Sequence, residues 1–272
     1  MSYWDGKRAV IIGGSSGLGR ALADVLGQHG ARLTIVGRRQ PQLDAATQEL
    51  TACGAEVISV PADVTVADDV ARLFETVKSS WGGADLLCHC AGRSMRGTVL
   101  ATPIDDYRAL WETNYLSAVR CIQQFASPLM GNRGHFVLVG SLASKIAAGY
   151  LGAYPASKFP LAALAQELRL ETEQRGLHTL LVCPGPIARE EEYASGSRYA
   201  AHEADFPAAA HQPGGGAKMR AINPHWLARK ILRACEQRRA ELVVPRRARL
   251  LFAISQLSPR IGDWLLRRMT SG

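Results

Sequence analysis

Tyr154 and Lys158 are the side chains of this sequence whose types and spacing best suit proton transfer. They lie four residues apart in a segment with helical spacing, so both project from one face of the expected helix. A free tyrosine has a pKa of about 10, and a neighbouring ammonium lowers that pKa by stabilising the phenolate. Ser141 stands thirteen residues upstream, at the expected end of a strand, where its hydroxyl can hold a carbonyl oxygen. These residues predict acid–base chemistry at a carbonyl or hydroxyl group.

A glycine-rich turn between the first expected strand and the first expected helix predicts a phosphate-binding site. Glycines permit a tight turn and a close approach of backbone to phosphate, and the N-terminus of the following helix offers free N–H groups to an anion. The turn has the position of a dinucleotide-binding turn, with the spacing GxxxGxG in place of GxGxxG, so we expect it to hold a dinucleotide. The turn residues expected to contact this cofactor are Gly13, Ser15, Ser16, Gly17, Leu18 and Gly19.

Two arginines at the end of the second expected strand favour NADP(H) over NAD(H). Enzymes that prefer NAD place a carboxylate there to bond the ribose 2′-hydroxyl, whereas this sequence has Gly37, Arg38 and Arg39. A guanidinium suits a 2′-phosphate because its planar fork gives charge-assisted hydrogen bonds to phosphate oxygens. The alternative is that both arginines are simply solvated at a strand end. We expect NADP(H), with NAD(H) as the less favoured cofactor.

The arrangement that would position these residues is an α/β fold, a single Rossmann-type doubly wound domain with a seven-stranded parallel sheet and helices on both faces. Short, almost wholly apolar runs alternate with longer segments of helical period, as expected for strands covered on both sides. The expected strands are Ala9–Ile12, Leu33–Val36, Glu56–Val60, Asp85–Cys90, His135–Gly140, Thr179–Cys183 and Leu242–Val244. The expected helices are Leu18–His29, Gln40–Cys53, Ala67–Trp81, Ile104–Met130, Tyr154–Arg175 and Pro224–Gln237.

Two segments depart from this alternation. We expect residues 1–245 to form the nucleotide-binding domain, with residues 188–223 inserted as a substrate lid, because a loop of that length in a compact domain is usually either disordered or functional. Residues 246–272 form a basic, amphipathic C-terminal extension that Pro259 divides in two. This extension could pack against the domain or a second subunit, or it could lie on an anionic membrane surface.

The bulk composition narrows the class of protein. At 272 residues, with 47% hydrophobic residues and a net charge of +8, the chain has the composition of a globular protein. No apolar run reaches the length of a membrane-spanning helix, and charges stand where a signal peptide would have its apolar core, so we expect a cytoplasmic protein. The positive charge is not gathered in a nucleic-acid-reading motif, and the six cysteines lack metal-ligand spacing. We expect neither a nucleic-acid partner nor a metal.

From Lys7 to Val244 the sequence closely resembles the short-chain dehydrogenase/reductases. The resemblance places the family's catalytic tetrad on Asn114, Ser141, Tyr154 and Lys158. It implies that Lys158 also bonds the nicotinamide ribose, that Asn114 helps to hold a water for proton relay, and that the subunits form a homodimer or homotetramer. The further positions that it assigns to the cofactor are Asp63 and Val64 near the adenine, Ala91 and Gly92, and Pro184, Gly185 and Ile187.

Several positions depart from the family's pattern. Ile12 replaces the threonine before the first glycine, which removes one hydrogen bond, and His89 and Cys90 replace two asparagines, which changes how that turn is braced. Pro155 follows the tyrosine where a small residue is usual, and proline is tolerated in the first turn of a helix. Arg189 replaces a threonine expected to contact the carboxamide of the cofactor. None of these positions belongs to the tetrad, so we expect activity to survive.

Within the family, the C-terminal extension and the helix start at Asn223 resemble, more loosely, the dehydrogenase/reductase member 7-like branch. The apolar segment Ala143–Leu151 favours a hydrophobic carbonyl or alcohol as the small-molecule substrate. We therefore predict an NADP-dependent oxidoreductase. Two alternatives stay open: an NAD-dependent alcohol dehydrogenase or epimerase on the same fold, and a non-catalytic protein that senses a dinucleotide by binding it. The intact tetrad disfavours the second.

Overall fold

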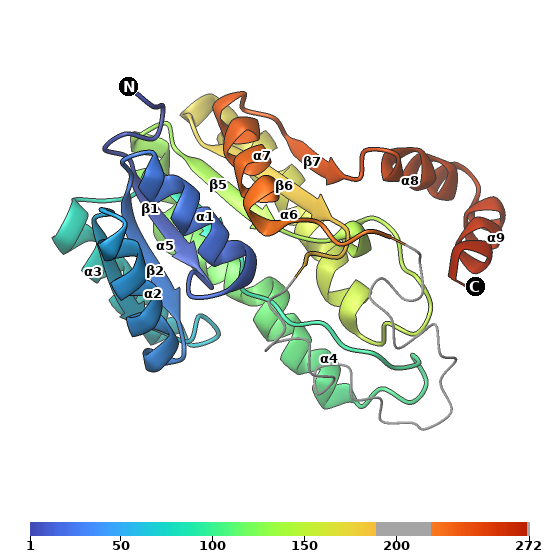
Figure 1. Cartoon of the computed structure of the whole chain (residues 1–272). Helices are drawn as coiled ribbons and strands as arrows, with labels where there is room; N and C mark the ends of the chain where they lie inside the picture. The colour runs from blue at the N-terminus through green and yellow to red at the C-terminus, as the bar shows by residue number, and fades with distance from the viewer. Residues whose placement is uncertain (189–218, 271–272) are drawn as a thin grey trace.

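Seven parallel strands form one sheet in the computed structural model, which describes residues 1–188 and 219–270 (Figure 1). The strand order is β3-β2-β1-β4-β5-β6-β7, and every neighbouring pair is parallel. All seven expected strands are present, within one residue of the predicted bounds, so the predicted doubly wound fold is confirmed. The strands are β1 (Arg8–Ile12), β2 (Arg32–Gly37), β3 (Val57–Pro61), β4 (Leu86–His89), β5 (His135–Val139), β6 (His178–Pro184) and β7 (Glu241–Val244).

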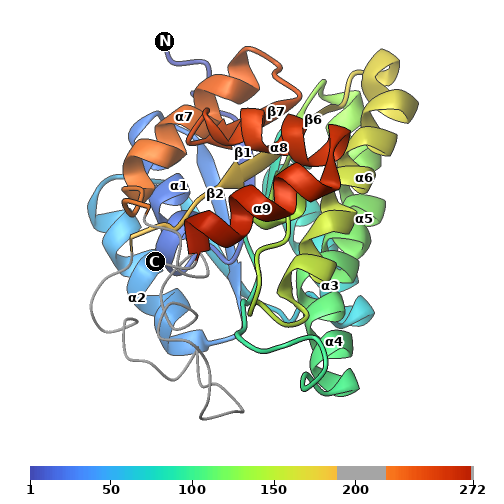
Figure 2. The ribbon, with the colours of Figure 1, turned by 90° about the vertical axis from the view of Figure 1, so that its right-hand side faces the viewer.

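Helices cover both faces of the sheet (Figures 1 and 2). On one face, α1, α2 and α7 bury an apolar layer that includes Leu22 and Ile231. On the other, α3, α5 and α6 bury a second layer that includes Phe125 and Leu161. Because both faces are covered, the strands are mostly apolar, and most of their polar residues lie at strand ends. The helices are α1 (Gly17–Gln28), α2 (Gln40–Ala52), α3 (Ala67–Trp81), α5 (Ser117–Gly131), α6 (Tyr154–Thr172) and α7 (Pro224–Glu236).

The single helix expected over Ile104–Met130 is divided. It forms α4 (Ile104–Trp111), a π-helical turn, η1 (Glu112–Leu116), and then α5. Apolar periodicity could not reveal this turn, because a π-helical turn widens the hydrogen-bonded ring without ending the helix. Such turns frequently occur at functional sites, and this one carries Asn114.

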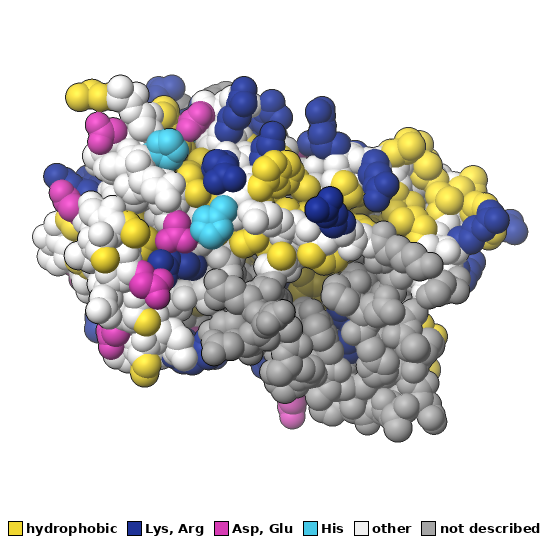
Figure 3. Space-filling model, in the orientation of Figure 1, with side chains coloured by type: hydrophobic (Ala, Val, Ile, Leu, Met, Phe, Trp, Pro, Cys, Tyr) yellow, Lys and Arg dark blue, Asp and Glu magenta, His cyan; other side chains and the backbone are white. Residues whose placement is uncertain are grey.

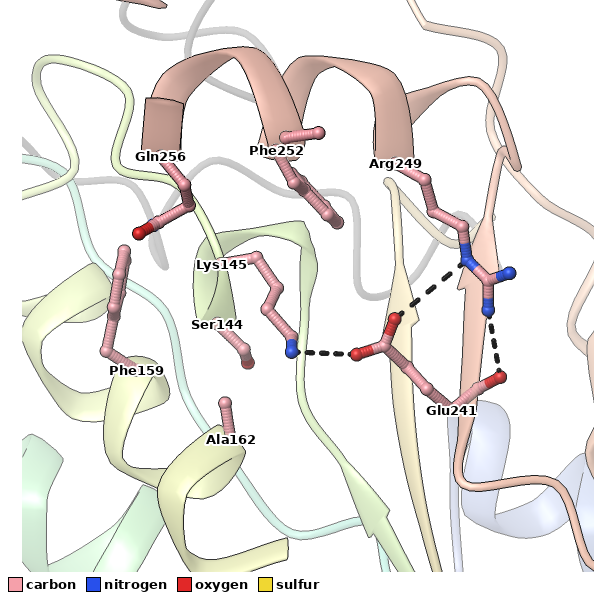
Figure 4. Close-up of a pocket in the computed structure, with 9 residues that line it drawn as sticks. Ser144, Lys145, Phe159, Ala162, Glu241, Arg249, Phe252 and Gln256 are labelled. Carbon is pink, nitrogen blue, oxygen red and sulfur yellow. Dashed lines mark hydrogen bonds and ion pairs between the residues drawn. The ribbon is translucent and has the colours of Figure 1, made fainter. Parts of the chain in front are cut away.

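The C-terminal extension forms two helices, α8 (Ala248–Leu257) and α9 (Pro259–Thr270), divided at the expected proline. They extend beyond the C-terminal end of β7 (Figure 1). α8 packs Ala248 and Phe252 against the second core layer. Together with α6 and the short 3-10 turn η2 (Leu142–Ser144), it borders a cavity of about 420 Å³ (Figure 4).

Most of the expected lid lies outside the described residues, which resume at residue 219, and Arg189 lies outside them too. Among residues 1–188 and 219–270, no helix is both long and apolar enough to cross a membrane.

Candidate active site

The expected site residues follow the carboxyl ends of neighbouring strands. The chain order reverses between β1 and β4 in the sheet, and open α/β sheets bind ligands at such a switch point. In register, His89 at the end of β4 pairs with Ile12 of β1 on one side and with Leu138 of β5 on the other. The glycine turn after β1, the Ala-Gly pair after β4 and Ser141 after β5 therefore leave the sheet at the same edge.

Lys158 is firmly fixed by its surroundings. It lies one helical turn after Tyr154 in α6 and is almost fully buried, and its Nζ donates a hydrogen bond to the carbonyl oxygen of Val139 at 3.1 Å. Val139 is the last residue of β5, so this bond ties α6 to the strand that leads to Ser141. Burial lowers the pKa of Lys158 to about 8. The side chain therefore remains mostly an ammonium at neutral pH, one helical turn from the phenol.

Tyr154 begins α6 in apolar surroundings. Its half-buried ring packs against a small cluster formed by Met95, Leu110 and Ala153. The Met95 loop is held to the segment before α6 by backbone hydrogen bonds on both sides of Gly97, such as Gly152 N–H to the Gly97 carbonyl at 2.9 Å. Residues 93–97 and the apolar segment 143–151 are thus brought together beside the tyrosine.

Ser141 caps the 3-10 turn η2, which contacts α6. Its Oγ accepts a hydrogen bond from the Ala143 N–H at 3.1 Å, and its own N–H donates to the Ser144 Oγ at 3.1 Å. A hydroxyl that accepts one bond still has its hydrogen to donate. The capping bonds fix the orientation of Ser141 and leave a donor suited to a substrate oxygen.

Asn114 connects the loop after β4 to α6. Its Oδ1 accepts from the Arg93 N–H at 2.8 Å, while its Nδ2 donates to the Arg93 carbonyl at 2.9 Å and to the Ser157 Oγ at 2.8 Å. Ser157 in turn donates to the Tyr154 carbonyl at 2.8 Å. Sequence reasoning did not single out Ser157, although its place immediately before Lys158 was the available signal. The amide of Asn114 therefore links the Arg93 backbone to the hydroxyl that holds the Tyr154 carbonyl.

The altered turn after β4 is braced by a buried histidine. The His89 Nε2 lies 2.9 Å from the Ser117 Oγ at the start of α5, and the Ser117 hydroxyl donates to the Thr113 carbonyl. Burial, together with the nearby Lys158 charge, lowers the pKa of His89 to about 3. The ring is therefore neutral, and the turn keeps a support although both family asparagines are replaced.

Gly92 lies where a side chain would enter the tetrad. A Cβ added there would lie 3.0 Å from the Asn114 Oδ1 and 3.2 Å from the Lys158 Nζ. Gly92 and two of the predicted catalytic side chains therefore share one small space. Only a residue without a side chain leaves room there for a bound ligand.

The glycine turn forms a cradle of backbone atoms. Gly13 and Gly17 have φ of 79° and 54°, and a Cβ on Gly19 would overlap the Gly13 carbonyl oxygen. A Cβ on Gly13 would lie 3.2 Å from the Ala91 nitrogen, so this turn also touches the one after β4. No described side chain caps the first turn of α1, whose N–H groups are suited to an anion. The other predicted contacts of this turn lie between the glycines: Ser15, Ser16 and Leu18.

The predicted arginines lie at the end of β2 beside the predicted acidic residue. The Arg38 Nη1 is 3.8 Å from the Asp63 Oδ2, and Asp63 also accepts hydrogen bonds from the N–H and hydroxyl of Thr65. Arg39 is exposed at the start of α2, and Val64 is buried beneath Asp63 in the second core layer. The structure therefore brings a cation and a carboxylate together next to the glycine turn.

The segment after β6 is paired on both sides. The Gly185 N–H donates to the Val244 carbonyl at 2.7 Å, directly after Pro184 ends the strand. Ile187 forms a parallel bridge with Ile222, and the Ala188 N–H donates to the Ile222 carbonyl at 2.8 Å. The predicted cofactor contacts of this segment thus lie on an ordered support at the same edge of the sheet as the tetrad.

Comparison with known proteins agrees with this fold. Residues 7–196 match the family described as short chain dehydrogenase. Dehydrogenase/reductase SDR family member 7B of Danio rerio is 35% identical over 189 residues, which are 66% of this chain and 61% of that protein. Dehydrogenase/reductase SDR family protein 7-like of Anopheles gambiae is 27% identical over 275 residues, 98% of this chain and 84% of that protein. The chain belongs to the short-chain dehydrogenase/reductase family of oxidoreductases, near its member 7 branch.

The chain spans less than two thirds of the length of several relatives that it matches. Glycine betaine reductase of Emericella nidulans is 32% identical over 186 residues, and the chain spans only 15% of its length.

Among solved structures, a short chain dehydrogenase/reductase from Burkholderia phymatum in complex with NAD has a TM-score of 0.84 at 24% identity, with 96% of each chain covered. L-Sorbose reductase from Gluconobacter frateurii, complexed with NADPH and L-sorbose, has a TM-score of 0.76 at 24% identity and covers 88% of this chain and 95% of that one. These likenesses show the fold.

Proposed function

We propose that this protein interconverts a hydrophobic carbonyl compound and its alcohol with NADP(H) as the cofactor. The observation that carries the proposal is the pairing of Tyr154 with a buried Lys158 anchored on the end of β5. Ser141 follows the same strand two residues later, with a hydroxyl hydrogen left to donate. Three groups therefore lie at one dinucleotide-binding edge of the sheet: an acid–base group, a cation that tunes its pKa, and a donor for a substrate oxygen.

The backbone cradle fits a nicotinamide dinucleotide. The glycine turn and the uncapped start of α1 would hold its pyrophosphate, Gly92 leaves room beside Lys158, and Arg38 and Arg39 would face a 2′-phosphate. When bound, this cofactor would supply or accept the hydride. The similar solved structures include one in complex with NAD and one complexed with NADPH, so they do not distinguish the two cofactors. The proposed preference for NADP(H) therefore rests on the two arginines.

In the direction of reduction, Tyr154 would donate its phenolic proton to the substrate oxygen while the Ser141 hydroxyl holds that oxygen. In oxidation, the same phenolate would take the proton back. The Lys158 ammonium would favour the phenolate and thereby bring the pKa of the tyrosine toward neutral pH. Asn114 would keep the backbone of Tyr154 in place through Ser157, and its role in a water relay stays a prediction.

The surroundings of Tyr154 support an apolar substrate. Met95 and Leu110 pack around the ring. Val99 and Leu100, shortly after residues 93–97, and Tyr150 in the segment 143–151 expose large apolar surfaces. A substrate site lined by such residues would bind by apolar contact, with a few polar groups that fix orientation. The homodimer or homotetramer implied by the family also stays a prediction.

The proposal is tested by a panel of aliphatic and aromatic ketones and aldehydes, with NADPH consumption followed by absorbance. We expect turnover on a hydrophobic member of the panel, and Tyr154→Phe should lower kcat by about 10²- to 10⁴-fold because the proton donor is lost. The Kd for NADPH, measured by fluorescence titration, should stay unchanged. Tyr115→Phe is the matched control, since that ring packs on Trp111. Normal turnover by the Tyr154→Phe variant would overturn the assignment.

A further inference from the structure

The outer side of α8 is apolar although its inner side is already buried. Ala248 and Phe252 face the core, whereas Leu250 and Leu257 are 68% and 88% exposed. Leu250, Ile254 and Leu257 recur at helical spacing, so they form one stripe on the side opposite Phe252. A helix with apolar residues on opposite sides is normally covered on both. The stripe therefore indicates a second contact surface.

α9 continues this surface. Ile261, Trp264 and Met269 each expose about half of their side-chain area. Gly262 packs against the backbone and side chain of Ser255, so closely that an added Cβ would lie 2.7 Å from the Ser255 Cα. The two helices thus meet at a closely packed corner, and each carries exposed apolar residues.

The base of α8 is tied to the domain. The Glu241 carboxylate of β7 forms ion pairs with the Lys145 Nζ at 2.7 Å and with the Arg249 Nε at 3.9 Å (Figure 4). The Arg249 Nη2 also donates a hydrogen bond to the backbone carbonyl of Glu241. These contacts, with buried Phe252, hold the inner side of α8 beside β7. The outer stripe is therefore presented outward by a helix that is fixed on its inner side.

The surface of α8 and α9 is strongly basic. The segment 246–272 contains six arginines and one acidic residue, Asp263, so it carries more than half of the net charge of +8. Dark blue and yellow side chains lie beside each other over these helices in Figure 3. The Arg268 guanidinium lies 5.1 Å from the centre of the Trp264 ring. Long arginine side chains can cover apolar groups while their charges reach an anionic plane, and tryptophan favours the boundary between apolar and polar phases.

We propose that α8 and α9 dock this protein on the surface of a lipid bilayer that contains anionic lipids. Both helices would lie in the plane of the interface, with Leu257, Ile261 and Trp264 inserted and the arginines among the headgroups. A second copy of the chain fits less well, because a symmetric contact would bring the same arginines together. This inference does not depend on the proposed function.

Co-sedimentation of the full chain with vesicles tests the proposal. We expect the protein to pellet with vesicles of phosphatidylcholine and phosphatidylglycerol in equal parts, and to remain in the supernatant with pure phosphatidylcholine or at high salt. The double variant L257E/W264E should bind at least about tenfold more weakly, because two inserted side chains are replaced by charges. L170E is the matched control: Leu170 on α6 is 79% exposed, and its replacement should leave binding unchanged.

Circular dichroism and NADPH titration of L257E/W264E show whether the variant is folded. The second double variant, R260E/R268E, should also bind the anionic vesicles more weakly, although Leu257 and Trp264 are unchanged in it. Wild-type protein that stays in the supernatant with the anionic vesicles overturns the proposal. So does anionic-vesicle binding that both double variants retain. A measurement of the molecular mass in solution tests whether a second copy of the chain covers this surface instead. That alternative holds if the wild type is an oligomer that does not bind vesicles and the L257E/W264E substitutions dissociate it.

Discussion

Arg38, the residue expected to select NADP(H), meets a carboxylate in this structure. Its Nη1 is 3.8 Å from the Asp63 Oδ2, and 70% of its side chain is exposed. An ion pair this exposed contributes at most about 1 kcal/mol, so Asp63 holds the guanidinium only weakly. Asp63 is itself held by Thr65. A 2′-phosphate can therefore compete for Arg38 without displacing the turn that carries Asp63.

Arg38→Ala should separate the two cofactors. A charge-assisted hydrogen bond contributes about 1.5 to 3 kcal/mol, so we expect the KM for NADPH to rise by about tenfold or more, while the KM for NADH changes little. Parallel kinetic titrations with both cofactors measure this. Arg32→Ala is the matched control, because Arg32 lies at the opposite end of β2 and pairs with Glu56. Equal changes for NADPH and NADH would reject a role of Arg38 at the 2′-phosphate.

At the scale of elements, the strands and most helices could be predicted because each carries its own signal. The apolar runs of the strands are bounded by glycines and polar residues, and Tyr154 and Lys158 share one helix at a spacing that places them together. The contacts between elements had no such signal. Lys158 binds the backbone carbonyl of Val139, which any residue type would supply. The hydrogen bond of His89 to Ser117 depends on the packing of α5 beside β4.

The π-helical turn η1 shows the same difference between local and tertiary signals. It places Asn114 where one amide reaches both the Arg93 backbone and Ser157. A regular α-helix through the same residues would give the identical apolar pattern. What the sequence could not supply is therefore the link between η1 and α6, which positions the tyrosine.

Ser157→Ala should test that link. The substitution removes the acceptor for the buried Asn114 Nδ2 and the bond to the Tyr154 carbonyl. We expect the free energy of unfolding to fall by about 1 to 3 kcal/mol and kcat to fall by about tenfold or more, because Tyr154 loses its fixed position. The Kd for NADPH should be unchanged. Urea unfolding, steady-state kinetics and the pH profile of kcat measure these effects.

Thr172→Ala supplies the control for Ser157. Thr172 is a second buried hydroxyl of α6, bonded to the Leu168 carbonyl near the far end of the helix. Its removal should lower stability without changing kcat or its pH profile. If Ser157→Ala behaves in the same way, Ser157 contributes to stability alone and does not position the tyrosine.

At the scale of the whole molecule, a buried hydrogen-bonded chain joins distant segments at the edge of the sheet opposite the site. The His178 Nε2 lies 2.8 Å from the Arg239 carbonyl, which can only accept, so this nitrogen carries the proton. The His178 Nδ1 then accepts from the His135 Nδ1 at 2.9 Å, and the His135 Nε2 accepts from the Tyr3 hydroxyl at 2.7 Å. The chain links the N-terminal segment, β5, β6 and the turn after α7. With these directions both rings are neutral, and the His178 Nδ1 must stay unprotonated to accept from His135.

The neutral pair predicts a loss of stability in acid. Burial, with His178 next in effect, lowers the pKa of His135 to about 3, and burial also lowers the pKa of His178. A lowered folded-state pKa means that the unfolded chain binds more protons between the ordinary value of about 6.5 and the folded value. The contribution to stability is therefore complete above about pH 6.5 and decreases as the pH falls toward 3. For His135 the loss at about pH 5.5 is about 1.4 kcal/mol.

Urea unfolding of His135→Asn and the wild type at neutral and mildly acid pH measures this contribution. The variant should be less stable at neutral pH because Tyr3 and His178 lose a partner, but its stability should fall less on acidification, by about the 1.4 kcal/mol that His135 supplies. His29→Asn, at the exposed end of α1, should keep the wild-type pH dependence. Since buried His89 also titrates with a pKa of about 3, part of the acid sensitivity should persist in His135→Asn. An unchanged pH dependence of stability in that variant would show that the pKa of His135 is not lowered in the folded protein.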